Sequence, residues 1–356
     1  MKKRILSVLL ICATTVSFAG NPDRAGEAGA SELLLNPWAK SNGWGSANSA
    51  SVVGLEAVHL NVAGLAFTKK TELMFTHTRL LVGSGVKMNA FGFSQRVSET
   101  GVLALGVTSL GFGEIDVTTV NLPEGGIGTF SPSYLNLALS YAKEFSNSIT
   151  GGISFKVINE AISNVKASGM AFDAGVRYVT GEYDQIKFGI ALRNVGPPMK
   201  YSGDGLAFTA TDPITGITST QEHRSANFEL PSLLNIGASY DFYLNAVEDT
   251  VTFEIKSDHK LTLAATYTSN SFTKDQYRFG VEYGYKSMVM ARLGYVFESQ
   301  TWFDSSKRTS AYTGPTAGLS FVAPLNKNGS TFSIDYAYQF TNPFSGTHNI
   351  GMRINL

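Results

Sequence analysis

The side chains that could do chemistry in this chain are few and scattered. No two histidines stand at the spacing of a metal-binding pair, and no Gly-x-Ser-x-Gly motif marks a nucleophilic serine. The glycine clusters Gly111-Phe-Gly113 and Gly125-Gly-Ile-Gly128 lack the strand–turn–helix context that binds phosphate, and loop flexibility explains them better. The histidines are His59, His77, His223, His259 and His348. The sequence therefore predicts no catalytic residue, no metal site and no cofactor, and the protein is not expected to be an enzyme.

Aromatic side chains beside charges form a second kind of candidate site, one for a protein partner. They lie in segment 299–312 and in segment 196–229. Large aromatics flanked by charges are typical of interface hot spots, where one buried ring contributes on the order of 2 kcal/mol. In segment 299–312 the same rings could instead rest on a membrane surface or fold over the mouth of a barrel, and both readings stay open. The candidate partner-binding residues are Trp302, Phe303, Tyr312, Tyr201 and Phe208.

The elements that position these residues are expected to be strands. From residue 71 onward, apolar side chains alternate with small or polar ones; for example, Tyr277, Phe279 and Val281 alternate with Arg278 and Gly280. Aromatics on the apolar face gather near segment ends, as membrane girdles require. The segments are 71–81, 86–96, 101–112, 132–144, 148–159, 169–180, 185–195, 230–243, 258–268, 275–286, 287–298, 313–323, 330–340 and 347–356. They predict an all-β fold, a transmembrane antiparallel β-barrel of about fourteen strands.

Both ends of the chain support export to an outer membrane. A basic head at Lys2-Lys-Arg4 precedes about a dozen mostly apolar residues and then Ser17-Phe-Ala19, the pattern of a secretory signal peptide. Its removal would leave 25 basic against 28 acidic residues and no cysteine, because Cys12 is the only one. Charged residues are 16% of the chain and form no basic patch, so a nucleic-acid partner is not expected. The last nine residues, 348–356, alternate strictly and end on an apolar residue, as the final strands of outer-membrane barrels do.

The expected domains are a signal peptide (1–19), an N-terminal plug (20–70) and the barrel (71–356). Short and long connections alternate, which places the C-terminus in the periplasm of a Gram-negative bacterium. Charged residues on the polar face are expected mainly to form salt bridges that stiffen the wall against the plug: Asp173, Arg177, Arg193, Glu282, Arg292 and Asp335.

The third segment carries an irregular pattern. Leu103, Leu105 and Val107 hold one phase of the alternation, whereas Leu110 and Phe112 hold the other. A bulge or kink would shift the phase in this way, and neighbouring glycines would permit it. We therefore predict a local break in this strand.

A family resemblance rests on the segment before the first strand. Asn61-Val-Ala-Gly-Leu-Ala66 is similar to the motif that ends the plug of FadL-type fatty-acid transporters, with valine in place of proline. Gly29-Ala-Ser-Glu-Leu-Leu-Leu-Asn-Pro-Trp38, Ala47-Asn-Ser-Ala-Ser51 and Gly54-Leu-Glu-Ala57 resemble the PorV/PorQ family. Members of that family are outer-membrane components of the type IX secretion system of Bacteroidetes and share the FadL-like barrel.

The resemblance implies a barrel adaptor that binds the large translocon barrel and the C-terminal signal domains of exported cargo. No residue contacts can be carried over from the family, because they follow no short motif. The alternative function is a FadL-type channel for uptake of hydrophobic small molecules. Such a channel should have an apolar lumen pocket, whereas the lumen-facing positions here are mostly Gly, Ser, Asn and charged. That difference favours the adaptor, with membrane lipid and the secretion partners as its neighbours.

Overall fold

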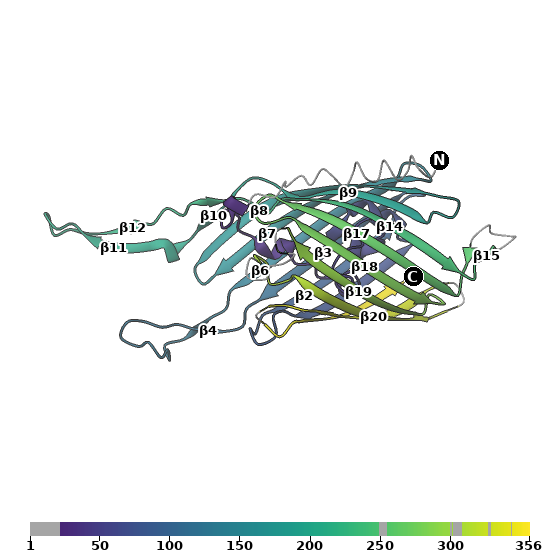
Figure 1. Ribbon diagram of the computed structural model, residues 1–356. Coiled ribbons are helices and arrows are strands. Elements are labelled where there is room, and N and C mark those ends of the chain that lie inside the picture. The colour runs from purple at the N-terminus through teal and green to yellow at the C-terminus, as the bar shows by residue number, and fades with distance from the viewer. Residues whose placement is uncertain (1–21, 249–254, 300, 302–307, 327–328, 343) are drawn as a thin grey trace.

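A computed structural model describes residues 22–248, 255–299, 301, 308–326, 329–342 and 344–356. The described chain forms a closed antiparallel β-barrel (Figure 1), in which each of fourteen strands pairs with the next and β22 pairs with β1. The all-β, fourteen-stranded prediction is therefore confirmed. The barrel strands are β1 (Thr71–Arg79), β2 (Lys87–Arg96), β3 (Gly101–Gly111), β6 (Ser133–Glu144), β7 (Ile149–Ile162), β8 (Val165–Thr180), β9 (Ile186–Val195), β14 (Leu233–Leu244), β17 (His259–Asn270), β18 (Gln276–Tyr285), β19 (Val289–Glu298), β20 (Gly314–Pro324), β21 (Thr331–Gln339) and β22 (Thr347–Asn355).

Alternation along each strand separates an apolar outer face from a polar or small inner face. On β8, Phe172 and Val176 point outward and are 54% and 53% exposed, whereas Asp173 and Arg177 point inward and are each 4% exposed. A belt of exposed apolar side chains on the outside suits hydrocarbon, because every backbone polar group of a closed barrel pairs within the sheet. Among the described residues, no helix is long and apolar enough to cross a membrane.

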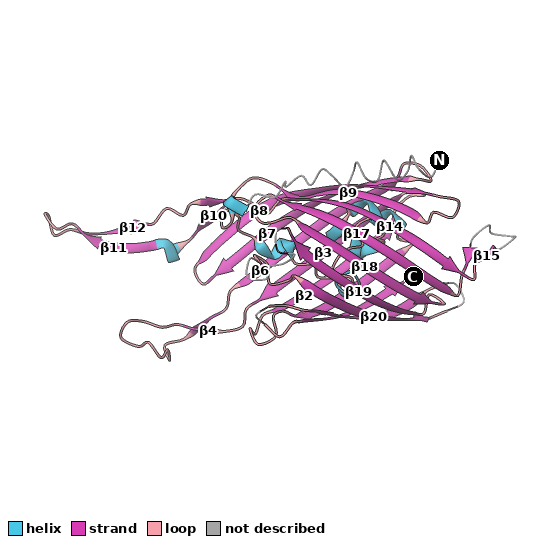
Figure 2. Cartoon of the chain, in the orientation of Figure 1, coloured by secondary structure: helices cyan, strands magenta, loops and turns pink. Residues whose placement is uncertain are grey.

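The two ends of the barrel differ. At one end, here called the long-loop end, two hairpins project beyond the wall (Figures 1 and 2): β4–β5 (Ile115–Asp116, Thr129–Phe130) and β11–β12 (Ala207–Thr211, Thr218–Glu222). β10 (Met199–Ser202) and β13 (Asn227–Phe228) extend the sheet there beyond β8, and η5 (Asp204–Leu206) precedes β11. The opposite, short-turn end holds the C-terminus and the small hairpin β15–β16 (Val247–Glu248, Ile255–Lys256).

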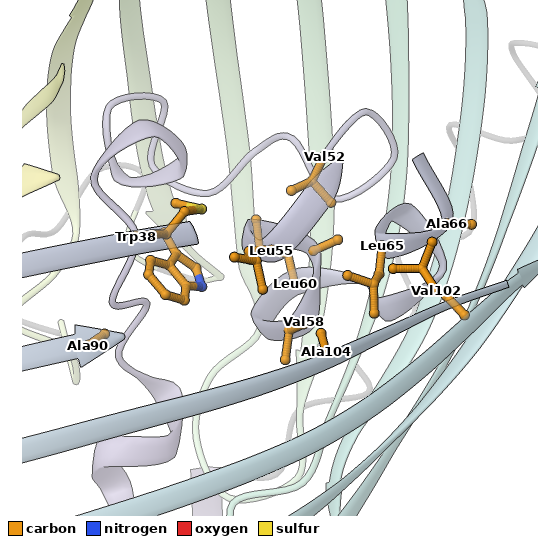
Figure 3. Close-up of a cluster of buried hydrophobic side chains, with 13 residues drawn as sticks. Trp38, Val52, Leu55, Val58, Leu60, Leu65, Ala66, Ala90, Val102 and Ala104 are labelled. Atoms are coloured by element: carbon orange, nitrogen blue, oxygen red, sulfur yellow. The ribbon is translucent and has the colours of Figure 1, made fainter. Parts of the chain in front are cut away.

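The N-terminal segment forms short helical turns inside the barrel (Figure 2). Figure 3 shows side chains such as Trp38, Leu55 and Leu65 packed with one another and against Ala90 and Val102 of the wall. This buried cluster explains why a leucine- and tryptophan-containing segment does not stay in solvent. The turns are η1 (Pro22–Arg24), η2 (Ser31–Leu34), α2 (Ala39–Asn42), η3 (Gly54–Glu56), α3 (Ala57–Leu60) and η4 (Val62–Phe67).

Asn61 shows what the plug-ending motif does physically. Its Oδ1 accepts a hydrogen bond from the Ala63 N–H at 3.2 Å and caps η4, while its Nδ2 donates to the Val176 carbonyl of β8 at 3.2 Å. Gly64 lies so close to the carbonyl oxygen of Val52 that an added Cβ would be 2.1 Å from it. The motif therefore folds the last turn of the plug and fastens it to the wall.

Buried charges fasten the plug to the barrel seam, where β22 meets β1. Arg353 of β22 contacts Glu56 of the plug at 2.6 Å and Asp335 at 3.2 Å. Glu72 of β1 accepts a hydrogen bond from the Leu55 N–H at 2.8 Å. Other inward charges pair as wall salt bridges or bind plug carbonyls: Lys156–Asp173, Arg292–Glu282 and Arg177 to the Val52 oxygen.

The segment crosses the whole lumen. At the long-loop end, Arg24 pairs with Glu229 at 2.9 Å and lies over the ring of Phe272. At the short-turn end, Arg96 donates to the carbonyls of Ala66 and Thr68 at 2.7 and 3.0 Å. Residues 22–67 therefore run from one mouth of the barrel to the other.

Two strand predictions were wrong. β3 pairs without any shift with β2 and β6 over Gly101–Gly111, so the predicted break is not there. Leu110 and Phe112 instead face inward and pack with other apolar side chains, so the pattern changes phase while the backbone stays regular. The interval 160–168, which the predicted segments 148–159 and 169–180 leave as a loop, is strand up to a turn at 163–164, because β7 and β8 continue pairing there.

Candidate ligand-binding vestibule and partner surfaces

A cavity of 520 Å³ lies toward the long-loop end of the lumen, between the plug and the barrel wall. We call it the vestibule. Part of its lining is apolar and forms a buried cluster with Met88 of the wall. This apolar lining combines strand ends, the β1–β2 loop, the plug and the 299–313 loop: Leu35, Leu80, Leu81, Val86, Leu110, Phe112, Tyr134 and Tyr312.

The rest of the vestibule lining is polar and includes two arginines, Arg193 and Arg278, and the carboxyl group of Glu32. Arg278 of β18 donates one hydrogen bond, to Gln276 Oε1 at 2.7 Å, and its Nε has no partner. No carboxylate among the described residues pairs with Arg278. Arg193 of β9 is more fully engaged, because it binds the Leu33 carbonyl at 3.2 Å and the His59 ring at 3.1 Å.

His59 of the plug stays neutral beside these arginines. Burial, reinforced by the positive charges of Arg193 and nearby cations, holds the pKa of His59 well below its ordinary value. The polar lining therefore presents the guanidinium of Arg278 as a cation with spare hydrogen-bond donors. Such an arrangement can bind an anion at one end of a molecule whose other end contacts the apolar lining.

A bulge in β9 shapes this polar lining. The β8–β9 register shifts between Phe172 and Ala174, and Asn194 adopts a positive φ of 57°. Arg193 and Asn194 both point inward as a result. Asp173 accepts the Asn194 N–H at 2.8 Å, and Asn194 Oδ1 accepts from Lys156 at 2.9 Å. The irregular strand of this wall is thus β9 rather than the predicted β3.

The plug separates the vestibule from a second cavity. This cavity of 340 Å³ lies at the short-turn end and is lined mainly by charged and polar side chains, including Arg177, Lys187, Asp241 and Lys260. The plug turn at residues 40–48 lines both cavities: Asn42, Gly45 and Ser46 border the vestibule, and Lys40, Trp44 and Asn48 border the second cavity.

The predicted partner-binding residues lie in different places. Trp302 and Phe303 fall outside the described residues. Tyr312 is half-buried in the vestibule lining, and burial raises its pKa to about 12, so the hydroxyl stays protonated. Tyr201 donates its hydroxyl to Glu160 and packs on Phe228, with ring centres 5.3 Å apart.

Phe208 lies apart from these residues, in the projecting β11–β12 hairpin, where its ring stacks on His223 at 4.1 Å. The tip of this hairpin exposes Ile214, which is 92% accessible, and Ile217. Asp212 orders the tip by accepting hydrogen bonds from the N–H groups of Ile214 and Thr215. The hairpin pairs with no other strand among the described residues.

Sequence reasoning missed the vestibule. Its signal was present in Leu110 and Phe112, whose inward phase marks an apolar patch at the end of a strand. Alternation along the strand places Arg278 on the inner face. Whether a carboxylate lies near it depends on side chains from other strands and on the plug, so the sequence alone does not show it.

Comparison with known proteins supports the fold alone. No protein-family model and no curated protein sequence matches the chain. Among solved structures, the Pseudomonas putida toluene transporter TodX aligns with a TM-score of 0.52 at 12% identity, covering 90% of this chain and 97% of that one. A TodX ΔS2S3 mutant, described as a monoaromatic hydrocarbon channel, aligns with a TM-score of 0.53 at 12% identity over 89% and 98%. The chain therefore has a FadL-like barrel fold of the outer-membrane type.

Proposed function

We propose that this barrel binds an amphipathic molecule with a hydrophobic body and an acidic group, as the first step of FadL-type uptake through an outer membrane. The observation that carries the proposal is Arg278, a cation without a carboxylate partner, in a cavity that also has an apolar lining. Each methylene buried against that lining contributes about 0.8 kcal/mol. The toluene transporter TodX and its mutant, a monoaromatic hydrocarbon channel, have the same fold and support the hydrophobic body of this ligand.

The vestibule also bears on the adaptor function. An adaptor was favoured over a channel because lumen-facing positions are mostly small, polar or charged. Leu110 and Phe112 face inward at the mouth and contradict it there, although most deeper positions do fit the description. Passage beyond the vestibule requires the plug to move, because the plug lies between the two cavities.

Binding of two ligands of equal chain length tests the proposal. Dodecanoate and dodecan-1-ol bury the same hydrocarbon, so a preference for dodecanoate reports the cation. Arg278→Gln should weaken dodecanoate binding roughly tenfold, the effect of losing one charge-assisted hydrogen bond, and leave dodecan-1-ol unchanged. Lys286→Gln, at the short-turn end, is the matched control and should change neither affinity. Equal dodecanoate affinity in wild type and Arg278→Gln would refute the proposal.

A second candidate function is the adaptor of a type IX secretion system. The projecting β11–β12 hairpin favours it, because two isoleucines are exposed at an ordered tip. Exposed aliphatic side chains held in one geometry are suited to burial by a protein partner. β3 pairs with β2 without a gap, so the wall has no opening there, and Arg353 holds the plug inside the lumen. A closed wall and a plugged lumen fit a scaffold better than an open channel.

Co-purification with named partners tests the adaptor function. Ile214→Ser with Ile217→Ser should abolish co-purification of the translocon barrel or of cargo C-terminal domains from native outer membranes. Val120→Ser, at the tip region of the other projecting hairpin and 100% exposed, is the matched control. The double variant Trp302→Ala with Phe303→Ala tests the sequence-based candidates in the same assay. Undiminished recovery of both partners with the isoleucine variant would exclude this hairpin as the contact.

A further inference from the structure

Three positively charged or ionisable side chains stand in one row on the outer wall at the long-loop end. Arg79 of β1 lies directly opposite Lys87 of β2 on one side and His348 of β22 on the other. Arg79 and Lys87 are exposed, and His348 is half-buried. In antiparallel strands, directly opposite side chains lie about 5 Å apart, so the three groups form one cluster. We call it the outer basic row.

The row marks the border of the apolar belt. Four residues along β1 from Arg79, toward the short-turn end, Phe75 lies opposite Phe91 and Met352, and all three are more than 40% exposed on the outer face. Tyr336 bonds His348 Nδ1 through its hydroxyl at 2.8 Å. Tyrosines at this level are typical of the interface between hydrocarbon and headgroups. The basic row therefore lies where lipid headgroups begin.

The protein itself does not neutralise the row. No ion pair joins Arg79 or Lys87 to any carboxylate in the described chain, and residues 73–98 contain no aspartate or glutamate. Like charges directly opposite on neighbouring strands destabilise a sheet. Placing Arg79 against Lys87 therefore costs stability unless an anion lies between them.

We propose that the outer basic row binds the phosphate of a membrane lipid in the leaflet at the long-loop end. The planar guanidinium of Arg79 donates to two phosphate oxygens, and the Lys87 ammonium adds a third donor. Because Tyr336 engages Nδ1 of His348, the other ring nitrogen is the one placed to donate. The acyl chains of the same lipid then lie along Phe75, Phe91 and Met352. This site is separate from the vestibule and does not depend on the proposed function.

Lipid retention measured by native mass spectrometry tests the site. The full mature barrel in dodecyl maltoside is titrated with diphosphoryl lipid A. Arg79→Gln with Lys87→Gln should weaken binding at least about tenfold, as expected for the loss of charge-assisted hydrogen bonds. Lys143→Gln is the matched control, because Lys143 faces outward on β6 at the short-turn end. Equal retention by wild type and the double variant would overturn the proposal, as would an equal loss with Lys143→Gln.

A competition arm separates a lipid site from a free-phosphate site. Inorganic phosphate should leave bound lipid A in place, because it lacks the acyl chains that pack on the belt. Displacement of the lipid by inorganic phosphate would overturn the lipid assignment.

The melting temperature in two media distinguishes lipid binding by Lys87 from a purely structural role of that residue. In phosphate-free detergent, Lys87→Gln should raise the melting temperature, because it relieves repulsion with Arg79. In nanodiscs containing lipid A the same variant should lower it, because a lipid contact is lost. A shift of the same sign in both media would refute the site.

Discussion

Trp38 controls how firmly the plug is docked. Its side chain is 4% exposed and packs in the cluster with Leu55 and against Gly92 of β2 (Figure 3). A tryptophan buries about 150–250 Å², which at about 25 cal/mol per Å² corresponds to about 4–6 kcal/mol. Truncation of buried aromatics costs about 3–5 kcal/mol in practice. Trp38→Ala should therefore raise the ratio of undocked to docked plug by about two to four orders of magnitude.

Planar-bilayer conductance measures this change directly. A docked plug blocks the lumen, so wild type should conduct rarely and Trp38→Ala should open far more often. Leu34→Ala is the matched control on the same segment, because Leu34 is already 36% exposed. Hydrogen exchange of plug amides should rise in parallel with conductance, since both report undocking. Unchanged conductance together with unchanged exchange in Trp38→Ala would refute the reasoning.

Three further predictions follow from the same geometry. A cysteine at Ser98 should be labelled only from the periplasm and one at Thr215 only from outside; labelling of Ser98→Cys on intact cells would reverse the orientation. Burial and a neighbouring carboxylate raise the pKa of Glu32 from 4.5 to about 7, so the folded state holds that proton more tightly. Stability should therefore fall as pH rises from about 4.5 through 7, and Glu32→Gln should remove this fall in pH-dependent melting. Gly294→Ala should prevent plug docking, because the added Cβ would be 2.3 Å from the plug backbone. Gly106→Ala should fold normally, because no atom lies nearer than 3.8 Å to the added Cβ. Equal heat-modifiability of the two variants on gels would contradict this prediction.

The strands were predictable because their signal is local. An alternation such as Tyr277 to Val281 assigns each side chain to a face without knowledge of its neighbours. The closure of β22 on β1 also follows from the strictly alternating C-terminal strand. The segment rich in leucine and tryptophan was expected to be buried, because exposing its apolar side chains to water costs free energy.

The vestibule was not predictable because it is assembled from distant pieces. Its apolar lining joins Leu35, Leu110 and Tyr312, which are separated by most of the chain. Alternation along a strand places Leu110 on the inner face only if the backbone is regular. The same residues also fit a kinked strand in which Leu110 faces outward. The β9 bulge was missed for another reason. Asparagine tolerates the positive φ that Asn194 adopts, but asparagines such as Asn159 and Asn235 lie in regular strands, so the residue type alone does not mark a bulge.

The path of the plug links the lumen to the seam at which the barrel closes. Residues 22–67 pass through the lumen from mouth to mouth and continue directly into β1. The plug also touches both sides of the seam, through Glu56 to Arg353 of β22 and through Leu55 to Glu72 of β1. The pairing of β22 with β1 closes the barrel, so closure joins two strands that share a partner inside the lumen. The N-terminal segment thus bridges the two strands that close the barrel, and its size inside the lumen has to match the circumference of the closed wall.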